Sequence, residues 1–296
     1  MRIAAAAYPL DFLADWAAFR NKLSTWVAEA ADHGAQLLVF PEYASMELAS
    51  LGGAAVALEL EASIREVARH GAASEALHAE LAQRHGVHIL AASRPVFAEP
   101  AQRPVNRAVL FGPQGRIGHQ DKLMMTRFER EQWHIGAGQD LAVMDTPLGR
   151  IGVIICYDSE FPLLARALAE SGVEILLAPS CTDSLAGFTR VRVGSMARAL
   201  ENQCAVVHAP TVGPAPWCPA VDENWGAAAV YGPADRDWPA NGILAEGPMN
   251  RPGWVYAEVD LAKVRQSRAD GHVLPFAHWP EQQAALTRLR RFGSPG

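Results

Sequence analysis

Residues 150–162 have the sequence RIGVIICYDSEFP, in which an apolar run ends at Cys156 and a polar segment follows. The β-branched residues before Cys156 predict a buried strand. The acidic residues after it, followed by Pro162, predict the start of a helix. Backbone N–H groups at such a strand-to-helix junction favour negative charge. The pattern therefore indicates a thiolate nucleophile, although an isolated cysteine after an apolar strand is more often a packing residue.

Strand and helix patterns alternate on both sides of this stretch. We expect strands at residues 2–7, 37–40, 87–92, 174–178, 204–208, 227–231, 242–245 and 254–259, and helices at 16–30, 54–84, 161–170 and 189–203. Glycine-containing turns at 112–115 and 147–149 predict two hairpins, over 106–121 and 141–155. Because these hairpins interrupt the alternation, the pattern favours a mixed-sheet layered α/β fold over a simple doubly wound sheet.

The composition excludes several classes of protein. The 296 residues carry a net charge of −6 and no cluster of Lys and Arg, so we expect neither a nucleic acid nor a membrane surface as a partner. No run of 18 apolar residues indicates a membrane span. Residues 1–8 pass directly into a strand pattern and lack the features of a secretory signal peptide.

The cysteines and histidines show no spacing typical of a metal site. Cys156, Cys181, Cys204 and Cys218 contain no CxxC pair, and the ten histidines contain no HExxH pattern. The chain also lacks a P-loop and a GxSxG elbow. We therefore expect no metal, and a reducing, cytoplasmic location.

Three residues with matched chemistry stand at the ends of predicted strands. Glu42 follows the strand at 37–40, and Lys122 and Cys156 each follow a hairpin strand. A thiol nucleophile needs a base, and a carboxylate serves if desolvation raises its pKa. A lysine ammonium can stabilise the oxyanion that forms on an attacked carbonyl, and the backbone N–H of Tyr157 is a second candidate donor. Together these residues predict nucleophilic attack on a carbonyl compound.

These residues carry a resemblance to a known family. FPE at 40–42, DKL at 121–123 and ICYDSEFP at 155–162 resemble the three signature motifs of the nitrilase superfamily of carbon–nitrogen hydrolases, in the same order. GRIG at 149–152 and ARALEN at 197–202 are also similar to stretches of that family. Each motif is weak alone, whereas three in order with these flanking stretches are specific.

The resemblance implies a fold, an assembly and a catalytic triad. It implies a four-layer α-β-β-α sandwich with two mixed sheets over residues 1–270, with residues 271–296 as a C-terminal tail that could lie at an oligomer interface. It also implies a homodimer or a larger homo-oligomer. The triad would be Glu42, Lys122 and Cys156, working without a cofactor.

The family often has a second active-site glutamate between the lysine and the cysteine, and two candidates exist here, Glu129 and Glu131. In many members that glutamate stands seven residues before a Pro-Gly pair. Glu131 stands seven residues before Gly138, with Ala137 in place of the proline. Glu131 is thus the preferred candidate, and we expect it to pair with the charge of Lys122.

The resemblance implies hydrolysis of a non-peptide carbon–nitrogen bond in a small amide, through a thioester acyl-enzyme, with release of ammonia or an amine. The sequence Cys-Tyr-Asp at 156–158 is similar to the amidase and N-carbamoyl hydrolase branches, whereas nitrilases commonly have Cys-Trp-Glu. Hydrolysis of an N-carbamoyl amine or amino acid, hydrolysis of a nitrile and acyl transfer to an amine remain alternatives. A catalytically silent metabolite-binding protein is the alternative from a different class.

The substrate-facing residues are the least specified by the sequence. Cys181, Thr182, Asp183 and Arg190 follow the strand after the nucleophile and are candidates for substrate contacts. Arg190 is a candidate for binding a substrate carboxylate, or else it pairs with Asp183 at the surface. The irregular loop at 210–225 is a candidate lid.

Overall fold

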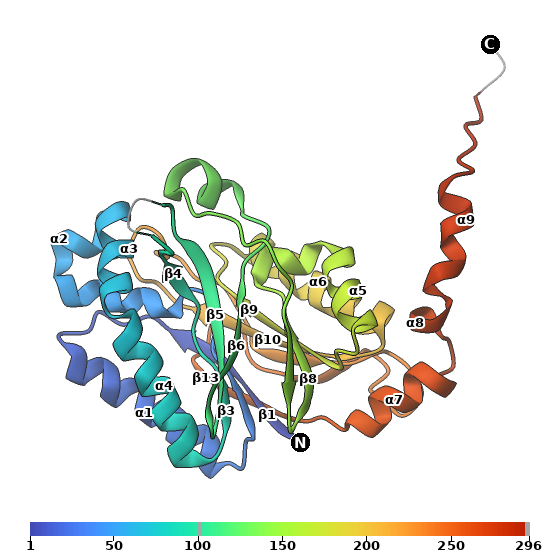
Figure 1. The fold of residues 1–296 in the computed structure, drawn as a ribbon, viewed down its shortest axis with the longest axis horizontal. Coiled ribbons are helices and arrows are strands. Elements are labelled where there is room, and N and C mark those ends of the chain that lie inside the picture. The colour runs from blue at the N-terminus through green and yellow to red at the C-terminus, as the bar shows by residue number, and fades with distance from the viewer. Residues whose placement is uncertain (100–101, 294–296) are drawn as a thin grey trace.

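The computed structural model describes residues 1–99 and 102–293. Within these residues thirteen strands form one hydrogen-bonded sheet, whose main path has the order β4-β5-β3-β2-β1-β10-β9-β8-β7 (Figure 1). The strands are β1 (Arg2–Pro9), β2 (Leu37–Val39), β3 (His88–Leu90), β4 (Arg94–Val96), β5 (Val105–Gly112), β6 (Gly115–Asp121), β7 (Val143–Thr146), β8 (Gly149–Val153), β9 (Ile175–Ser180), β10 (Ala205–Val212), β11 (Ala229–Tyr231), β12 (Ile243–Glu246) and β13 (Gly253–Glu258).

The sheet consists of two halves that meet along a short parallel pairing of β1 with β10. Only two residue pairs make this junction, Tyr8 with Thr211 and Pro9 with Val212. The first half contains β1 to β6 together with β13, which returns to pair antiparallel with β1. The second half contains β7 to β12. The α/β class and the mixed strand directions are confirmed, and the two expected sheets are the halves of one continuous sheet.

Helices lie on the outer side of each half. Figure 1 shows α1 to α4 on one side of the strands, and α5 and α6 on the opposite side. The helices are α1 (Trp16–Asp32), α2 (Ala54–Ala57), α3 (Leu60–Arg69), α4 (Gly71–His85), α5 (Pro162–Glu170), α6 (Leu185–Asn202), α7 (Leu261–Asp270), α8 (Pro275–His278) and α9 (Gln283–Leu286). Shorter helical turns are η1 (Ala44–Gly52), η2 (Glu129–Trp133), η3 (Cys156–Glu160) and η4 (Trp279–Gln282).

The order of the layers follows from which side chains pack together. Successive strand residues point to opposite faces, so alternate residues of one strand enter different apolar clusters. On β9, Ile175 and Leu177 pack with side chains of the first half, whereas Leu176 packs beneath α5 and α6. On β1, Ala4 and Ala6 face α1 and α4, whereas alternate residues face the second half. The apolar clusters therefore lie between helices and sheet, between the two sheet halves, and again between sheet and helices.

Most of the expected elements are present, and one is divided. The helix expected over 54–84 is three helices, because the backbone is extended at Glu59 and turns at His70. At the second break Gly71 lies against Arg94, and an added Cβ there would be 2.6 Å from a guanidinium nitrogen. Alanine-rich sequence has no strong stop signals of its own, so these breaks depend on packing.

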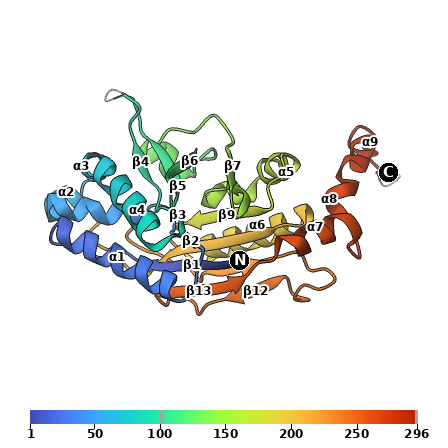
Figure 2. The same ribbon diagram turned by 60° about the horizontal axis from the view of Figure 1, so that its bottom comes forward.

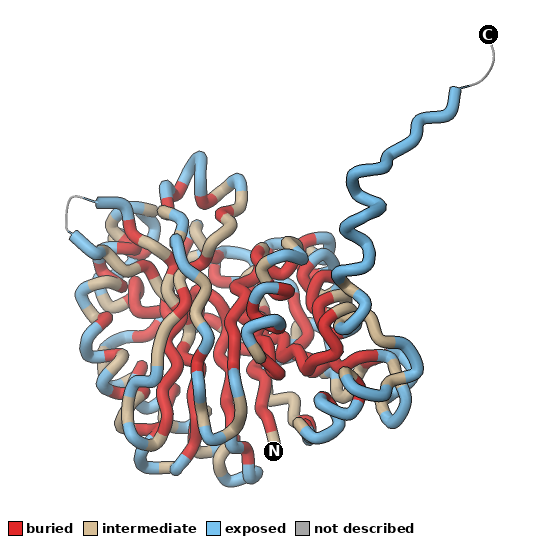
Figure 3. Tube along the Cα trace, turned by 45° about the vertical axis from the view of Figure 1, so that its right-hand side comes forward, coloured by how far each residue is buried: buried red, intermediate tan, exposed pale blue. Residues whose placement is uncertain are grey.

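The C-terminal segment extends away from the sheet. Figure 2 shows α9 at the end of the molecule, away from the sheet, and Figure 3 shows the last part of the tube exposed. The preceding helix α8 contacts α5. Phe276 is half-buried within the chain itself, where the guanidinium groups of Arg166 and Arg268 lie 4.6 and 4.4 Å from its ring centre. A role of residues 271–296 at an oligomer interface stays a prediction, and the last three residues lie outside the described part. Among the described residues, no helix is both long and apolar enough to cross a membrane.

Candidate active site

Four strand ends converge on one place between the two sheet halves. Glu42 follows β2 and Lys122 follows β6, both in the first half, whereas Cys156 follows β8 and Cys181 follows β9 in the second half. The strands β2, β8 and β9 are short and largely apolar, and β6 pairs with the largely buried strand β5. Each strand end is therefore fixed, and the first polar side chains after it are presented at the sheet edge. The fold thus brings Glu42, Lys122 and Cys156 together, as the sequence predicts.

The carboxylate of Glu42 is buried, and both of its oxygens accept hydrogen bonds. Its Oε1 accepts hydrogen bonds from Lys122 Nζ at 2.7 Å and Asn106 Nδ2 at 3.0 Å, and its Oε2 accepts one from the backbone N–H of Cys181 at 3.0 Å. Burial raises the pKa of Glu42 to about 7, against the opposing effect of the Lys122 charge. A carboxyl group with such a pKa can exchange protons near neutral pH.

Lys122 lies between two carboxylates. Its Nζ is 2.7 Å from Glu42 Oε1 and 2.7 Å from Glu129 Oε2, and the side chain is 1% exposed. Burial alone acts to lower the pKa of Lys122, but the charges of Glu129 and Glu42 outweigh it and raise the pKa well above its usual range. The ammonium therefore stays charged, and it can act as a fixed positive group beside the thiol.

The structure places Glu129, rather than Glu131, against Lys122, which corrects the prediction made from the sequence. Glu129 is 2% exposed and also accepts a hydrogen bond of 2.8 Å from the hydroxyl of Tyr43. Glu131 has 56% of its side chain exposed and pairs with Arg127 at the surface. Burial acts to raise the pKa of Glu129, but the charge and hydrogen bond of Lys122 outweigh it and hold that pKa below its usual value.

A sequence signal for Glu129 does exist. Thr126 and Glu129 form a capping box, in which Glu129 Oε2 accepts the N–H of Thr126 at 2.8 Å and Thr126 Oγ1 accepts the N–H of Glu129 at 3.3 Å. The Thr-x-x-Glu pattern at 126–129 predicts this arrangement. Counting back from Gly138 missed it, because the intervening turn η2 is of the π type and has no regular sequence spacing.

Cys156 begins η3 in a strained conformation. Its φ of 49° lies in the left-handed region, which a non-glycine residue adopts at a cost of about 1 kcal/mol or more. The thiol is within hydrogen-bonding reach of Glu42, and its Sγ is 3.8 Å from the carbonyl oxygen of Cys181. Burial and the carboxylate of Glu42 raise the pKa of the Cys156 thiol well above its usual value. The resting group is therefore a thiol that needs a base, rather than the stabilised thiolate that the helix start predicts.

The turn after the nucleophile is held from two sides. The buried carboxylate of Asp158 accepts the N–H of Ile155 at 3.0 Å and also that of Met124 at 2.7 Å. Asp158 therefore ties the segment that follows Lys122 to the segment that carries Cys156, a link that the sequence does not reveal. On the other side, Arg198 Nη1 donates to the carbonyl of Ser159 at 3.2 Å.

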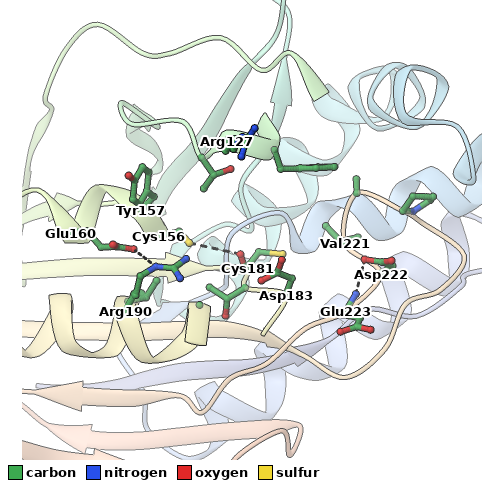
Figure 4. Close-up of a pocket in the computed structure, with 17 residues that line it drawn as sticks. Arg127, Cys156, Tyr157, Glu160, Cys181, Asp183, Arg190, Val221, Asp222 and Glu223 are labelled. Carbon is green, nitrogen blue, oxygen red and sulfur yellow. Dashed lines mark hydrogen bonds and ion pairs between the residues drawn. The ribbon is translucent and has the colours of Figure 1, made fainter. Parts of the chain in front are cut away.

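A cavity of about 340 Å³ opens onto the thiol (Figure 4). The cavity is lined by Cys156 and by all four candidates for substrate contacts, Cys181, Thr182, Asp183 and Arg190. The backbone of Tyr157, the predicted oxyanion donor, lies in the first turn of η3, where N–H groups have no partner within a helix. Residues 219–223 of the loop at 210–225 also line the cavity, and the role of this loop as a lid stays a prediction.

The polar side chains of this cavity have specific partners. Arg190 Nε pairs with Glu160 at 3.3 Å rather than with Asp183, so neither of the two expected roles is its resting contact (Figure 4). The hydroxyl of Thr182 donates to the carbonyl of Trp225 at 2.8 Å. In the described part of the chain, no group of three or more His, Cys, Asp or Glu side chains is arranged to hold a metal ion.

Comparison with known proteins finds one matching family model and several sequence relatives. A family model described as carbon-nitrogen hydrolase matches residues 2–269. The chain is 34% identical to "Probable hydrolase YhcX" of Bacillus subtilis (strain 168), over 92% of this chain and 52% of that protein. It is 31% identical to "Bifunctional nitrilase/nitrile hydratase NIT4A" of Lupinus angustifolius, over 58% of this chain and 52% of that protein. The chain therefore spans about half the length of these two relatives.

A solved structure shows the same fold. The amidase from Nesterenkonia sp. superposes with a TM-score of 0.66 over 91% of this chain and 94% of its own, at 23% sequence identity. At that identity the likeness concerns the arrangement of helices and strands.

Proposed function

The chain belongs to the carbon–nitrogen hydrolase family, and from this we propose that it cleaves a non-peptide carbon–nitrogen bond in a small amide, through a thioester on Cys156. The observation that carries the proposal is the position of Glu42. This carboxyl group has a pKa raised by burial to about 7, lies within reach of the Cys156 thiol and is bonded to the Lys122 ammonium. These are the parts that a base-assisted thiol attack on a carbonyl requires.

The first half of the reaction forms the acyl-enzyme. Glu42 takes the proton from Cys156 Sγ as the sulfur attacks the amide carbon. The carbonyl oxygen becomes an oxyanion, stabilised by Lys122 Nζ and by the backbone N–H of Tyr157. Glu42 then returns the proton to the amide nitrogen, the carbon–nitrogen bond breaks, and ammonia or an amine leaves a thioester on Cys156.

The second half releases the acid. Glu42, again a carboxylate, takes a proton from a water molecule that attacks the thioester carbon. The same two donors stabilise the second oxyanion. The carbon–sulfur bond then breaks, and the departing sulfur takes the proton from Glu42, which restores the Cys156 thiol and the Glu42 carboxylate. Glu129 keeps Lys122 charged and in place throughout, because its own pKa is held low by that contact.

The test is ammonia release from a panel of aliphatic and aromatic amides, ω-amides of dicarboxylates, N-carbamoyl compounds and nitriles. Wild type is compared with Cys156→Ala, and with Cys204→Ala as a control for a buried thiol outside the site. The proposal expects turnover in wild type and the control only. Full turnover in Cys156→Ala contradicts it.

Two alternatives use the same residues and are separated by the same panel. N-carbamoyl hydrolysis yields carbon dioxide together with ammonia, and the family relationship to a nitrilase keeps nitriles in the panel. Acyl transfer shows as a new amide when an amine is added. A catalytically silent binding protein shows no turnover and no faster alkylation of Cys156 than of the other three cysteines.

We also propose a homodimer formed through α5 and α6. Four leucine or valine side chains on these helices are more than half exposed: Leu163 at 70%, Leu185 at 53%, Val193 at 56% and Leu200 at 52%. Apolar side chains gathered on neighbouring helices favour association with a second copy. Light scattering after size exclusion tests this, and Leu163→Glu with Val193→Glu should give a monomer.

All four cysteines are free thiols, which supports a reducing, cytoplasmic compartment.

A further inference from the structure

Cys181 contacts both reactive side chains through its backbone. Its N–H donates to Glu42 Oε2 at 3.0 Å, and its carbonyl oxygen accepts from the Cys156 thiol at 3.8 Å. Oε2 of Glu42 accepts no hydrogen bond from Lys122 or Asn106, which both donate to Oε1. The placement of Cys181 therefore fixes the orientation of the carboxylate that has to exchange a proton with the thiol.

The side chain of Cys181 is turned toward the loop at 213–225. Its Sγ donates to Oδ1 of Asn224 at 3.3 Å. Asn224 is 3% exposed, and its Nδ2 donates to the carbonyl oxygens of Gly213 at 3.0 Å and Val221 at 2.8 Å. Both donors and the acceptor of this buried amide are thus occupied, which holds Oδ1 in one direction.

A second pair of bonds fastens the same two segments. The N–H of Trp225 donates to the carbonyl of Thr182 at 2.8 Å, and the Thr182 hydroxyl donates to the carbonyl of Trp225 at 2.8 Å. The residues that immediately follow Cys181 and Asn224 are therefore also locked to each other. The segment after β9 and the loop that forms the cavity wall behave as one unit.

We propose that Asn224 is a positioning residue, which acts by anchoring Cys181 so that the Cys181 N–H holds Glu42 in the orientation needed for proton transfer with Cys156. Cys181 is then also a positioning residue rather than a substrate contact. The inference rests on the proposed function, because it assigns the base role to Glu42. It predicts that the cavity wall influences the base through the side chains of Asn224 and Cys181.

The test compares Asn224→Ala and Cys181→Ala with Cys181→Ser, which keeps a donor for Asn224 Oδ1. Cys218→Ala is the matched control, since Cys218 is a buried thiol in the same loop, with its pKa raised by burial but without a hydrogen bond to Asn224. We expect kcat to fall by roughly 10- to 100-fold in the two alanine variants, with little change in KM. Cys181→Ser and Cys218→Ala should stay near wild type.

The pH dependence of kcat distinguishes the two explanations, because a general loss of packing would not shift its acidic limb. The Cys181 N–H stabilises the charged form of Glu42, so a loosened Cys181 should move the acidic limb of kcat upward by about one pH unit. In the double variant, Asn224→Ala with Cys181→Ala, the losses should not add, because both remove the same bond. The proposal is overturned if the losses of kcat add in the double variant, or if kcat falls while the acidic limb of its pH profile stays where it is in wild type.

A failure of the function itself would look different. If no substrate is turned over, the pH dependence of Cys156 alkylation by iodoacetamide still reports on the Glu42 base. A shift of that profile in Asn224→Ala and not in Cys218→Ala supports the positioning role without any substrate. Identical profiles in the two variants overturn it, whatever reaction the protein catalyses.

Discussion

The ammonium of Lys122 and the carboxylate of Glu129 lie 2.7 Å apart, with at most 2% of either side chain exposed. Lys122 is equally close to Glu42, so one positive charge faces two carboxylates in a buried space. A single ammonium can compensate one of them, and the second is then costly to ionise. The directions of the two pKa changes agree with this, since that of Glu129 is lowered and that of Glu42 is raised. Glu129 is therefore the permanent counter-ion, and Glu42 is free to exchange a proton.

Glu129→Gln should reduce kcat by about 100-fold or more, because the ammonium loses its counter-ion and is drawn toward Glu42. Glu131→Gln is the matched control, two residues away and at the surface. It should retain wild-type activity within about twofold. Steady-state kinetics with the best amide of the panel measure both. Equal effects of the two substitutions would contradict the assignment.

Lys122→Met should lower the free energy of unfolding by about 3–5 kcal/mol at pH 7.5, because two buried carboxylates lose their only ammonium partner. The pKa of each carboxyl group then rises, so the deficit should shrink as the pH falls toward 5 and both groups take up protons. Urea unfolding at the two pH values measures this. Lys263→Met, at an exposed lysine, is the control and should be near neutral. A deficit that does not depend on pH would argue against buried charge as its cause.

The rate should depend on pH through Glu42. Because the carboxylate form is the active base, kcat/KM should rise about tenfold per pH unit below pH 7 and level off above the pKa of about 7. Glu42→Gln should abolish activity, so this variant should show no rise of kcat/KM with pH. Stopped assays between pH 5 and 9 test this. A flat profile across pH 6 to 8 would exclude Glu42 as the titrating base.

The same group should affect stability in the opposite direction. Its pKa in the folded chain, about 7, lies above the ordinary value of 4.5, so the folded state holds the proton more tightly. The stabilising contribution is complete below pH 4.5 and is lost as the pH rises to 7, amounting to about 3 kcal/mol at most. Unfolding of wild type and Glu42→Gln should therefore differ in its pH slope across this window, with the steeper decline in wild type. Parallel slopes would contradict the raised pKa.

Gly194 on α6 should be sensitive to a single methyl group. An added Cβ would lie 2.8 Å from the carbonyl oxygen of Ser159, in the turn that carries Cys156. Gly194→Ala should cost about 1–3 kcal/mol of stability and lower kcat, because η3 is pushed away from α6. Thr189→Ala, at an exposed position on the same helix, should change neither. Thermal unfolding and kinetics together check the pair, and a fully active Gly194→Ala would show that η3 does not need this contact.

The strands next to the site were predictable because their physical signals are local. The apolar runs before Glu42 and Cys156 and the hairpin before Lys122 each specify a strand and its end, and the topology of the fold brings those ends together. The Glu129 assignment failed for a different reason. Residues 123–142 contain no regular strand spacing, and their path depends on contacts of Asp158, Tyr43 and Lys122 with backbone and side chains of that segment.

The network beyond the triad was also hidden from the sequence. Asn224 and Cys181 are 43 positions apart, and nothing in either local pattern indicates that they touch. The second break within residues 54–84 likewise lies against Arg94, a residue of a later strand. Such features arise only after the strands have packed, so they are decided by tertiary structure rather than by periodicity.

The narrow junction of β1 with β10 has a consequence for how this protein would be inactivated. Glu42 and Lys122 belong to one half of the sheet and Cys156 to the other, so the proposed reaction centre exists only while the two halves keep their mutual alignment. A slip of an ångström between them changes the sulfur–carboxylate distance yet breaks no hydrogen bond within either half. The rate of the proposed reaction should therefore respond to a loss of this alignment before the secondary structure does. A preparation with native secondary-structure content can thus be inactive.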